Sequence, residues 1–219
     1  MSAQPFLRRS PSPIVPELCI HGTRLTGAKA RVPIEVQEQA RHAVELFQQG
    51  QYTEAEKESR AVLAALAPFF GPEDAGILLI RDNLASTLCA QGKLAEGVEE
   101  HRVVLAIWER THGPDHGNTV QTRTNLAKAL NKLGKYAEAE KELRTVLAIW
   151  ERQRGAKDVL VLEICHDLAL TLVRLEKLEE ALELAKRTEK GFRGPLGIKH
   201  AGFREARTLR EEIDSKLNK

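Results

Sequence analysis

Asn-Leu-Ala-Lys-Ala-Leu-Asn-Lys-Leu-Gly-Lys-Tyr-Ala-Glu-Ala, residues 125–139, belongs to a unit that returns along the chain at a fixed spacing. Its first three residues match Asn-Leu-Ala at 83–85, 42 residues earlier, and Asp-Leu-Ala at 167–169, 42 residues later. Self-similarity at a period of this length indicates a repeat architecture. We therefore expect four units, over 33–74, 75–116, 117–158 and 159–200.

The unit 117–158 has the pattern of two helices joined by a short turn. Apolar residues before Gly134 recur at spacings of three and four, and those from Tyr136 to Trp150 do the same. Glycine is favoured just after a helix because it adopts positive φ without strain. Small residues fill one column of the predicted second helices, where they let paired helices approach closely. The members of this column are Ala55, Gly97, Ala139 and Ala181.

Over about residues 34–200 the sequence resembles the tetratricopeptide repeat family. The resemblance is carried by a small residue, Leu, Gly, Tyr and Ala at matching offsets of each helix pair. The unit is 42 residues long, whereas ~34 residues are usual in the family. This length, with loops such as Gly113-Pro114-Asp115-His116, resembles the kinesin light chain subclass. This resemblance implies an all-α, right-handed superhelical solenoid of helix-turn-helix repeats. The first helix of each pair would line a concave groove.

Composition narrows the class of protein further. The 219 residues carry a net charge of +2 and are 42% hydrophobic and 29% charged, with a mean hydropathy of −0.34. No stretch approaches the ~20 apolar residues of a membrane span, and the charge is too small to imply nucleic acid. The three cysteines form no C-x-x-C pair, which favours buried thiols in a reducing cytoplasm.

The two ends depart from the repeat. Residues 201–219 have the pattern of one amphipathic helix, which we expect to cap the last unit. Residues 1–32 contain four prolines and an excess of basic residues, and we expect a flexible extension. An untargeted tail, a secretory leader and an organelle transit peptide all remain open, although the prolines interrupt the apolar region that a leader needs.

A column of Asn and Asp is the candidate ligand-binding feature. The resemblance implies that Asn83, Asn125 and Asp167 face the groove and bond the backbone of an extended peptide. A carboxamide suits this task because it donates and accepts at once. The alternative is an intramolecular role, in which these side chains bond a neighbouring helix or their own preceding turn.

Charged and polar groove positions around the column extend the candidate site. They are Gln121, Thr124, Lys128, Lys132, His166 and Arg174. The basic members could hold a carboxylate through charge-assisted hydrogen bonds, so the protein or peptide ligand could be acidic. The alternative is an ordinary solvated face.

Motifs for catalysis are absent from the sequence. It has no phosphate-binding glycine loop, no nucleophile elbow and no H-E-x-x-H metal motif. His112 and His116 lie in a Gly-Pro turn, and the neighbours Cys165 and His166 point about 100° apart on a helix. We therefore expect neither an enzyme nor a cofactor or metal. Trp108 and Trp150 share a column with Phe192 and are expected in the core.

Two functions from different classes follow. The first is a non-enzymatic interaction adaptor whose concave groove binds a peptide or helical segment of a partner protein. The second is a regulatory sensor whose groove binds a small signal peptide and changes superhelical conformation. Neither requires nucleic acid or a membrane, and the sequence leaves the oligomeric state open.

Overall fold

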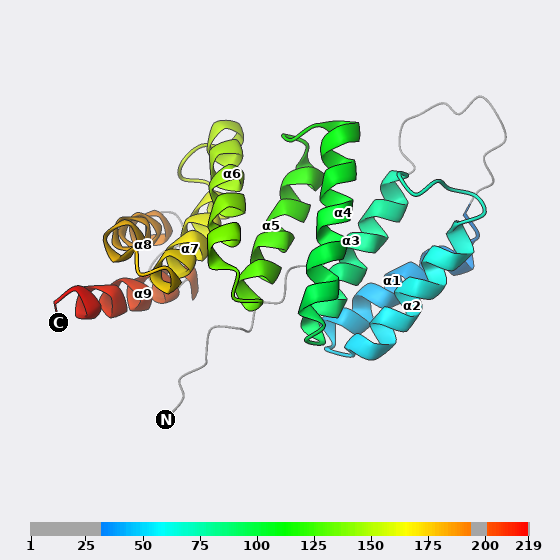
Figure 1. The fold of residues 1–219 in the computed structure, drawn as a ribbon, viewed down its shortest axis with the longest axis horizontal. Coiled ribbons are helices and arrows are strands. Elements are labelled where there is room, and N and C mark those ends of the chain that lie inside the picture. Colours follow the sequence, from blue (N-terminus) through cyan, green and yellow to red (C-terminus); the bar gives the residue numbers. More distant parts are fainter. Residues whose placement is uncertain (1–31, 194–200, 219) are drawn as a thin grey trace. The chain divides into compact units, whose positions relative to one another are not determined.

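The computed structural model describes residues 32–193 and 201–218. The extension expected over 1–32 lies, apart from Val32, outside these residues. Within the described part every regular element is a helix (Figure 1). The helices are α1 (Ile34–Gln48), α2 (Tyr52–Leu66), α3 (Ala75–Ala90), α4 (Leu94–His112), α5 (Gly117–Lys132), α6 (Tyr136–Arg154), α7 (Val159–Arg174), α8 (Leu178–Arg193) and α9 (Ala201–Leu217).

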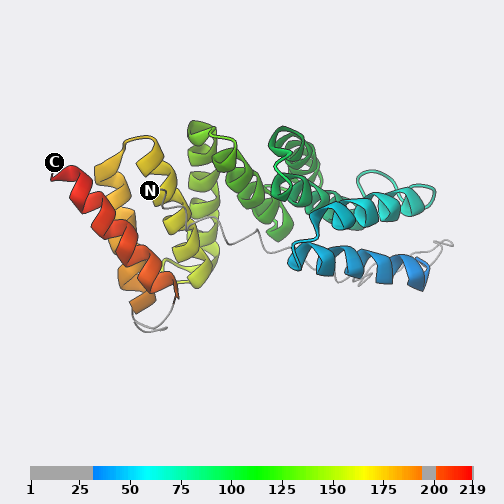
Figure 2. The ribbon, with the colours of Figure 1, turned by 90° about the horizontal axis from the view of Figure 1, so that it is seen from below.

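The chain forms two compact units, Met1–Asn125 and Leu126–Lys219, and the boundary falls inside α5. In the first unit each helix from α1 to α4 packs against the next, as Figure 2 shows for α1 and α2. Leu78 of α3 and Val104 and Trp108 of α4 form one fully buried cluster. The helix-period pattern of the sequence therefore corresponds to faces that neighbouring helices bury.

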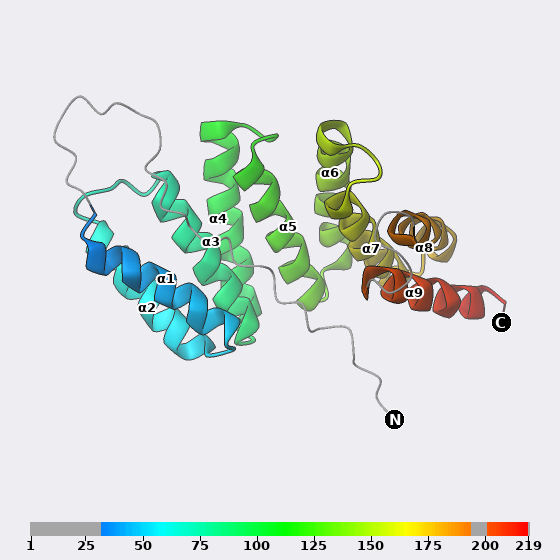
Figure 3. The same cartoon turned by 180° about the vertical axis from the view of Figure 1, so that it is seen from behind.

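The second unit has the same sequential packing from α6 to α9. Helices α8 and α9 lie against each other in Figures 1 and 3. Leu162 of α7, Phe192 of α8 and Phe203 of α9 form a buried cluster. Residues 201–217 are thus a helix with its apolar side buried, as the sequence indicated. Its role as a cap stays a prediction.

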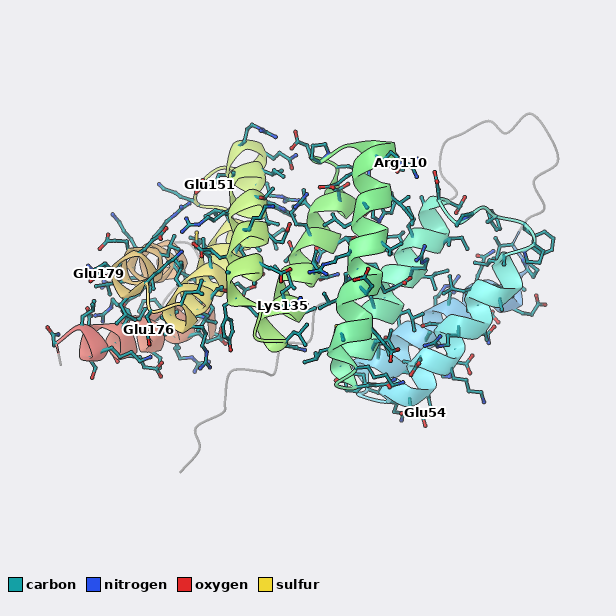
Figure 4. All side chains as sticks on the ribbon, in the orientation of Figure 1. Glu54, Arg110, Lys135, Glu151, Glu176 and Glu179 are labelled. Atoms are coloured by element: carbon teal, nitrogen blue, oxygen red, sulfur yellow. The ribbon has the colours of Figure 1, made fainter. Side chains whose placement is uncertain are left out.

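Aspartates and glycines set several helix ends. Asp74 and Asp158 accept hydrogen bonds from Gly76 N and Leu160 N at 2.9 Å, which caps the first turns of α3 and α7. The turns after α1, α3 and α5 pass through glycines with φ of 78°, 87° and 82°. The corresponding position after α7 is Glu176, with φ of 59° (Figure 4).

The two tryptophans differ in burial. Trp108 is fully buried, as expected. Trp150 is only partly buried, and the Arg154 guanidinium lies 4.2 Å from its ring centroid. The expectation of a core position therefore holds for Trp108 and is too strong for Trp150.

Candidate peptide-binding surface

The predicted groove residues of the first unit lie on α3 and α5. Asn83 on α3 and Gln121 on α5 are partly buried. Thr124 and Asn125 are only 6% and 3% exposed. The Thr124 hydroxyl donates to the carbonyl of Val120 at 2.9 Å, so it is bonded within its own helix.

Asn125 belongs to a buried polar network that joins three helices. Its Nδ2 donates to Oδ2 of Asp82 on α3 at 2.7 Å, and its Oδ1 accepts from Gln121 Nε2 at 3.2 Å. The other oxygen of Asp82 accepts from Nδ1 of His101 on α4 at 2.8 Å. Asp82 and His101 are 0% and 1% exposed. In this structure Asn125 has the intramolecular role that the sequence left open.

Charge explains why this network is stable inside the protein. Burial acts to lower the pKa of His101, but the Asp82 carboxylate and its hydrogen bond raise that pKa to about 9. His101 is therefore an imidazolium at neutral pH, and it neutralises the buried carboxylate. Removing one partner of such a pair would leave an uncompensated buried charge.

Sequence reasoning missed His101, although the repeat contains a signal for it. The equivalent positions of the other 42-residue repeats hold Ser59, Leu143 and Ala185. The column of Asp82 holds Ala40, Thr124 and His166 in the other repeats, so a carboxylate stands there in the second repeat alone. Two polar residues that depart from the repeat within one helix pair indicate a partnership that is specific to that pair.

The second unit holds the basic part of the predicted site. Lys128 on α5 lies 3.6 Å from Asp167 on α7, between Nζ and Oδ2. Asn131 on α5 donates from Nδ2 to the Thr171 hydroxyl of α7 at 2.9 Å. These contacts bring the second half of α5 beside α7, and they bring Lys128 together with Asp167.

Two predicted cations of this unit have no partner among the described residues. Lys132 and Arg174 occupy the last turns of α5 and α7, one repeat period apart, and neither makes an ion pair or hydrogen bond there. Lys132 is partly buried and Arg174 is exposed, while His166 is partly buried on α7. The surface therefore offers two positive charges to a ligand.

Two further searches cover the described part of the chain. None of its helices is both long and apolar enough to cross a membrane. No group of three or more His, Cys, Asp or Glu side chains within residues 32–193 and 201–218 could hold a metal ion.

Comparisons with known proteins agree with this architecture. A family model described as tetratricopeptide repeat matches residues 74–141 and 123–193, which together exceed half of the chain. Two structures of a Podosopora anserina protein described as a kinesin light chain with nearly identical TPR-like repeats give TM-scores of 0.72 and 0.71. Both are 25% identical and cover 86% of this chain and 94% of theirs.

More distant structures share the fold. BtubC (BKLC) from P. vanneervenii gives a TM-score of 0.65 at 18% identity, over 85% of this chain and 84% of its own. The apo form of RapI gives 0.64 at 13% identity, over 86% and 72%. A search of curated proteins finds no match. With its all-α repeat fold of the solenoid class and its kinesin-light-chain-like units, the chain belongs to the tetratricopeptide repeat family.

Proposed function

We propose that the protein is a non-enzymatic adaptor that binds an acidic peptide segment of a partner protein. Tetratricopeptide repeats serve as scaffolds for protein–protein interaction, which supports the general class. The observation that carries the finer proposal is the pair Lys132 and Arg174, which have no anionic partner among the described residues. A ligand carboxylate would form charge-assisted hydrogen bonds with them.

The proposed ligand site is the surface of the second unit formed by α7 and the second half of α5. Its residues are Lys128, Lys132, Asp167, His166 and Arg174. Lys128 already faces Asp167 at 3.6 Å, a distance that leaves the ammonium able to turn to a ligand. Asp167 can accept a hydrogen bond from the peptide backbone. Asn125 is not part of this site, because it bonds Asp82 inside the protein. The groove role of Asn83 on α3 stays a separate prediction.

The setting that we propose is the cytoplasm. Cys89 and Cys165 are both free and buried, which supports a reducing compartment.

Peptide selection tests this proposal. The full-length protein is used to select from a display library of random peptides, and the enriched sequences are compared with the starting library. We expect enrichment of Asp and Glu. A selected peptide, fluorescently labelled, then provides the probe for anisotropy measurements.

Paired charge reversals locate the binding surface. Lys132→Glu with Arg174→Glu should weaken the selected peptide by about tenfold or more, since it replaces two attractions with two repulsions. Lys57→Glu with Lys190→Glu changes the net charge equally at exposed positions of α2 and α8 and should leave affinity within about twofold. Equal loss in both pairs, or none in the first, would contradict the site.

The same probe separates the adaptor from the sensor. An adaptor that binds by fit to an existing surface should show little change in hydrogen exchange away from the second unit. A ligand-dependent change in exchange through the first unit would favour the sensor instead.

A further inference from the structure

Three rings meet at the connection between α4 and α5 (Figure 1). His112 is the last residue of α4, and His116 directly precedes α5. The His112 ring meets the edge of the Trp108 indole with the ring centroids 4.7 Å apart, and the His116 ring stacks on the same indole at 5.6 Å. The centroids of the two imidazoles are 4.8 Å apart. Trp108 is fully buried and both histidines are exposed, so a pair of imidazoles faces solvent beside a fixed indole.

The repeat pattern does not account for these two histidines. Asp74 and Asp158 stand at the positions equivalent to His116, and each caps the helix that follows it. Arg154 stands at the position equivalent to His112 in the third repeat. Histidine occupies both positions in the second repeat alone. The imidazole pair is therefore specific to this connection.

Hydrogen bonds determine which nitrogen of His112 is available. The Thr111 hydroxyl donates its single proton to the carbonyl of Ile107 at 2.8 Å. Its oxygen lies 2.7 Å from Nδ1 of His112 and therefore accepts a hydrogen bond from that nitrogen. In the neutral imidazole, Nε2 then carries the lone pair. A metal-bound histidine is oriented in the same way, by the hydrogen bond that its other ring nitrogen donates.

His116 is held by its backbone, and its ring nitrogens bond no described residue. Its carbonyl accepts from Val120 N at 3.0 Å, and the Thr119 hydroxyl donates to the carbonyl of Gly113 at 2.9 Å. These bonds tie the turn between the two histidines to α5. Partial burial lowers the pKa of His116, and the neighbouring His112 lowers it further, which favours the neutral form that a metal requires.

The spacing of the two imidazoles fits one shared metal ion. A metal–nitrogen bond of about 2.0–2.1 Å places the ion roughly 3.2 Å from the centroid of each ring. Two imidazoles at an angle of about 90–109° around the ion then have centroids about 4.5–5.2 Å apart. The observed 4.8 Å lies within this range. Both side chains are exposed, so their rings can turn toward a common ion without disturbing the core.

We propose that His112 and His116 bind one divalent transition-metal ion, through Nε2 of His112 and a ring nitrogen of His116. Imidazole suits Zn²⁺, Cu²⁺ and Ni²⁺, and Cu²⁺ should bind most tightly of the three. Water completes the coordination, so the site needs no third protein ligand, and the described part of the chain has no group of three. The sequence alone indicated a turn without a metal here, because the contact between the rings is visible only in the structure. The site lies in the first unit and does not depend on the peptide-binding proposal.

Trp108 provides a local probe for this site. In the full chain carrying Trp150→Phe it is the only tryptophan, and both histidine rings contact it. Cu²⁺ has an unfilled d shell and quenches the fluorescence of a nearby indole. The ion is titrated at about pH 7.5, where a histidine of ordinary pKa is neutral. We expect quenching that saturates and that EDTA reverses, whereas quenching that rises linearly without saturation would overturn the proposal.

Two substitutions ask whether the histidines hold the ion. His112→Gln and His116→Gln each remove one ligand and should weaken Cu²⁺ binding at least about tenfold, since even partners outside the ligand shell are worth that much. His42→Gln, at an exposed position of α1, is the matched control and should change the affinity by less than about twofold. An unchanged affinity in either of the first two variants would overturn the proposal.

Thr111→Val tests the orientation of the first ligand. It removes the oxygen that accepts from Nδ1 of His112 and should weaken Cu²⁺ binding by about tenfold. Thr145→Val is the matched control, because the exposed Thr145 on α6 makes the same kind of bond to the carbonyl of Lys141 at 3.0 Å. An equal effect of the two threonine substitutions would contradict the assignment of Nε2 as the ligand.

Circular dichroism establishes that each variant is folded. If a histidine variant does not fold, electron paramagnetic resonance of the parent protein with one equivalent of Cu²⁺ decides the question. Coupling of the copper to two imidazole nitrogens supports the proposal. Its absence overturns it.

Discussion

Asn83 and Asn125 stand one repeat apart, yet their surroundings differ. Asn125 bonds Asp82, the residue 43 positions before it. The residue 43 positions before Asn83 is Ala40, which offers no hydrogen-bond partner, and both line a small cavity between α1, α2 and α3. The carboxamide of Asn125 is therefore a structural donor to Asp82, while the groove role of Asn83 stays a prediction.

Asn125→Ala should lower the free energy of unfolding by about 1–3 kcal/mol, because one oxygen of the buried Asp82 carboxylate loses its donor. Asn125→Asp should be more harmful, since it places a second carboxylate against Asp82. Urea denaturation at neutral pH measures both effects. A loss below about 0.5 kcal/mol for the alanine variant would contradict the network.

Glu176 has a backbone conformation that its residue type rarely adopts. It has φ of 59° where the equivalent turns have Gly50, Gly92 and Gly134. Its side chain is exposed and makes no interaction with the described residues, so little is lost when it is removed.

Glu176→Gly should stabilise the protein by about 0.5–1 kcal/mol, because glycine adopts this conformation without steric cost. Glu176→Val should destabilise it, since a β-branched residue tolerates positive φ least. Chemical denaturation of the two variants provides the measurement. The same sign of change in both would contradict the argument.

At the scale of helices, the sequence predicted the helix pairs, because such a prediction needs only the periodicity of apolar residues. Apolar spacing of three and four, with Gly134 between the two apolar runs, indicated the helix pair α5 and α6. The strained turn at Glu176 could not be recognised from composition, because glutamate usually indicates a helix interior. Its position in the glycine column was the available signal.

Ion-pair clusters between successive helix pairs form a second feature at this scale. Glu56 on α2 accepts from Lys93 and from Gln91, each at 2.8 Å, and pairs with Arg60. Two repeat periods later, Glu140 on α6 pairs with Lys177 and Arg144, both at 2.8 Å. Each glutamate thus ties a second helix to the turn that follows the next first helix.

Acid should weaken the Glu56 cluster. The hydrogen bond from Lys93 is the largest cause that lowers the pKa of Glu56, to about 2 from an ordinary value of 4.5. A lowered folded-state pKa stabilises the protein above about pH 4.5, and that stability is lost as the pH falls toward about 2.

Glu56→Gln should therefore cost about 1–2 kcal/mol at neutral pH, after allowance for solvent screening, and progressively less toward pH ~2. Glu38→Gln, at an exposed position of α1, serves as the control and should change little at either pH. Urea titrations across this pH range provide the test. A difference from the parent that did not shrink in acid would show that charge is not responsible.

For the molecule as a whole, the 42-residue period predicted a repeat architecture, and the resemblance to tetratricopeptide repeats implied the family and fold class. The candidate site could be predicted only in part. Lys132 and Arg174 were visible as basic residues in one column. The buried network of Asn125, Asp82 and His101 could not be predicted from the sequence, because it depends on which side chains of three helices meet. Repeats fix the backbone arrangement, and the departures from them determine the local chemistry.

The loss of stability on mutation should also be local, since each repeat of an array depends on its nearest neighbours. Leu172 on α7 is fully buried in the second unit, and Leu172→Ala should cost about 2–5 kcal/mol there. With Trp150→Phe as background, Trp108 becomes the only tryptophan and reports on the first unit. Far-UV circular dichroism reports on all helices.

Leu172→Ala should therefore shift the circular dichroism midpoint to lower urea more than the Trp108 fluorescence midpoint. Leu78→Ala is the matched control, because Leu78 packs in the cluster of Trp108 and should shift the fluorescence transition directly. Separated transitions in the first variant would show that the helices near Trp108 remain folded after α7 is lost. Coincident transitions in both variants would show instead that the array unfolds as one cooperative body, and local damage near the proposed peptide site would then destabilise the whole chain.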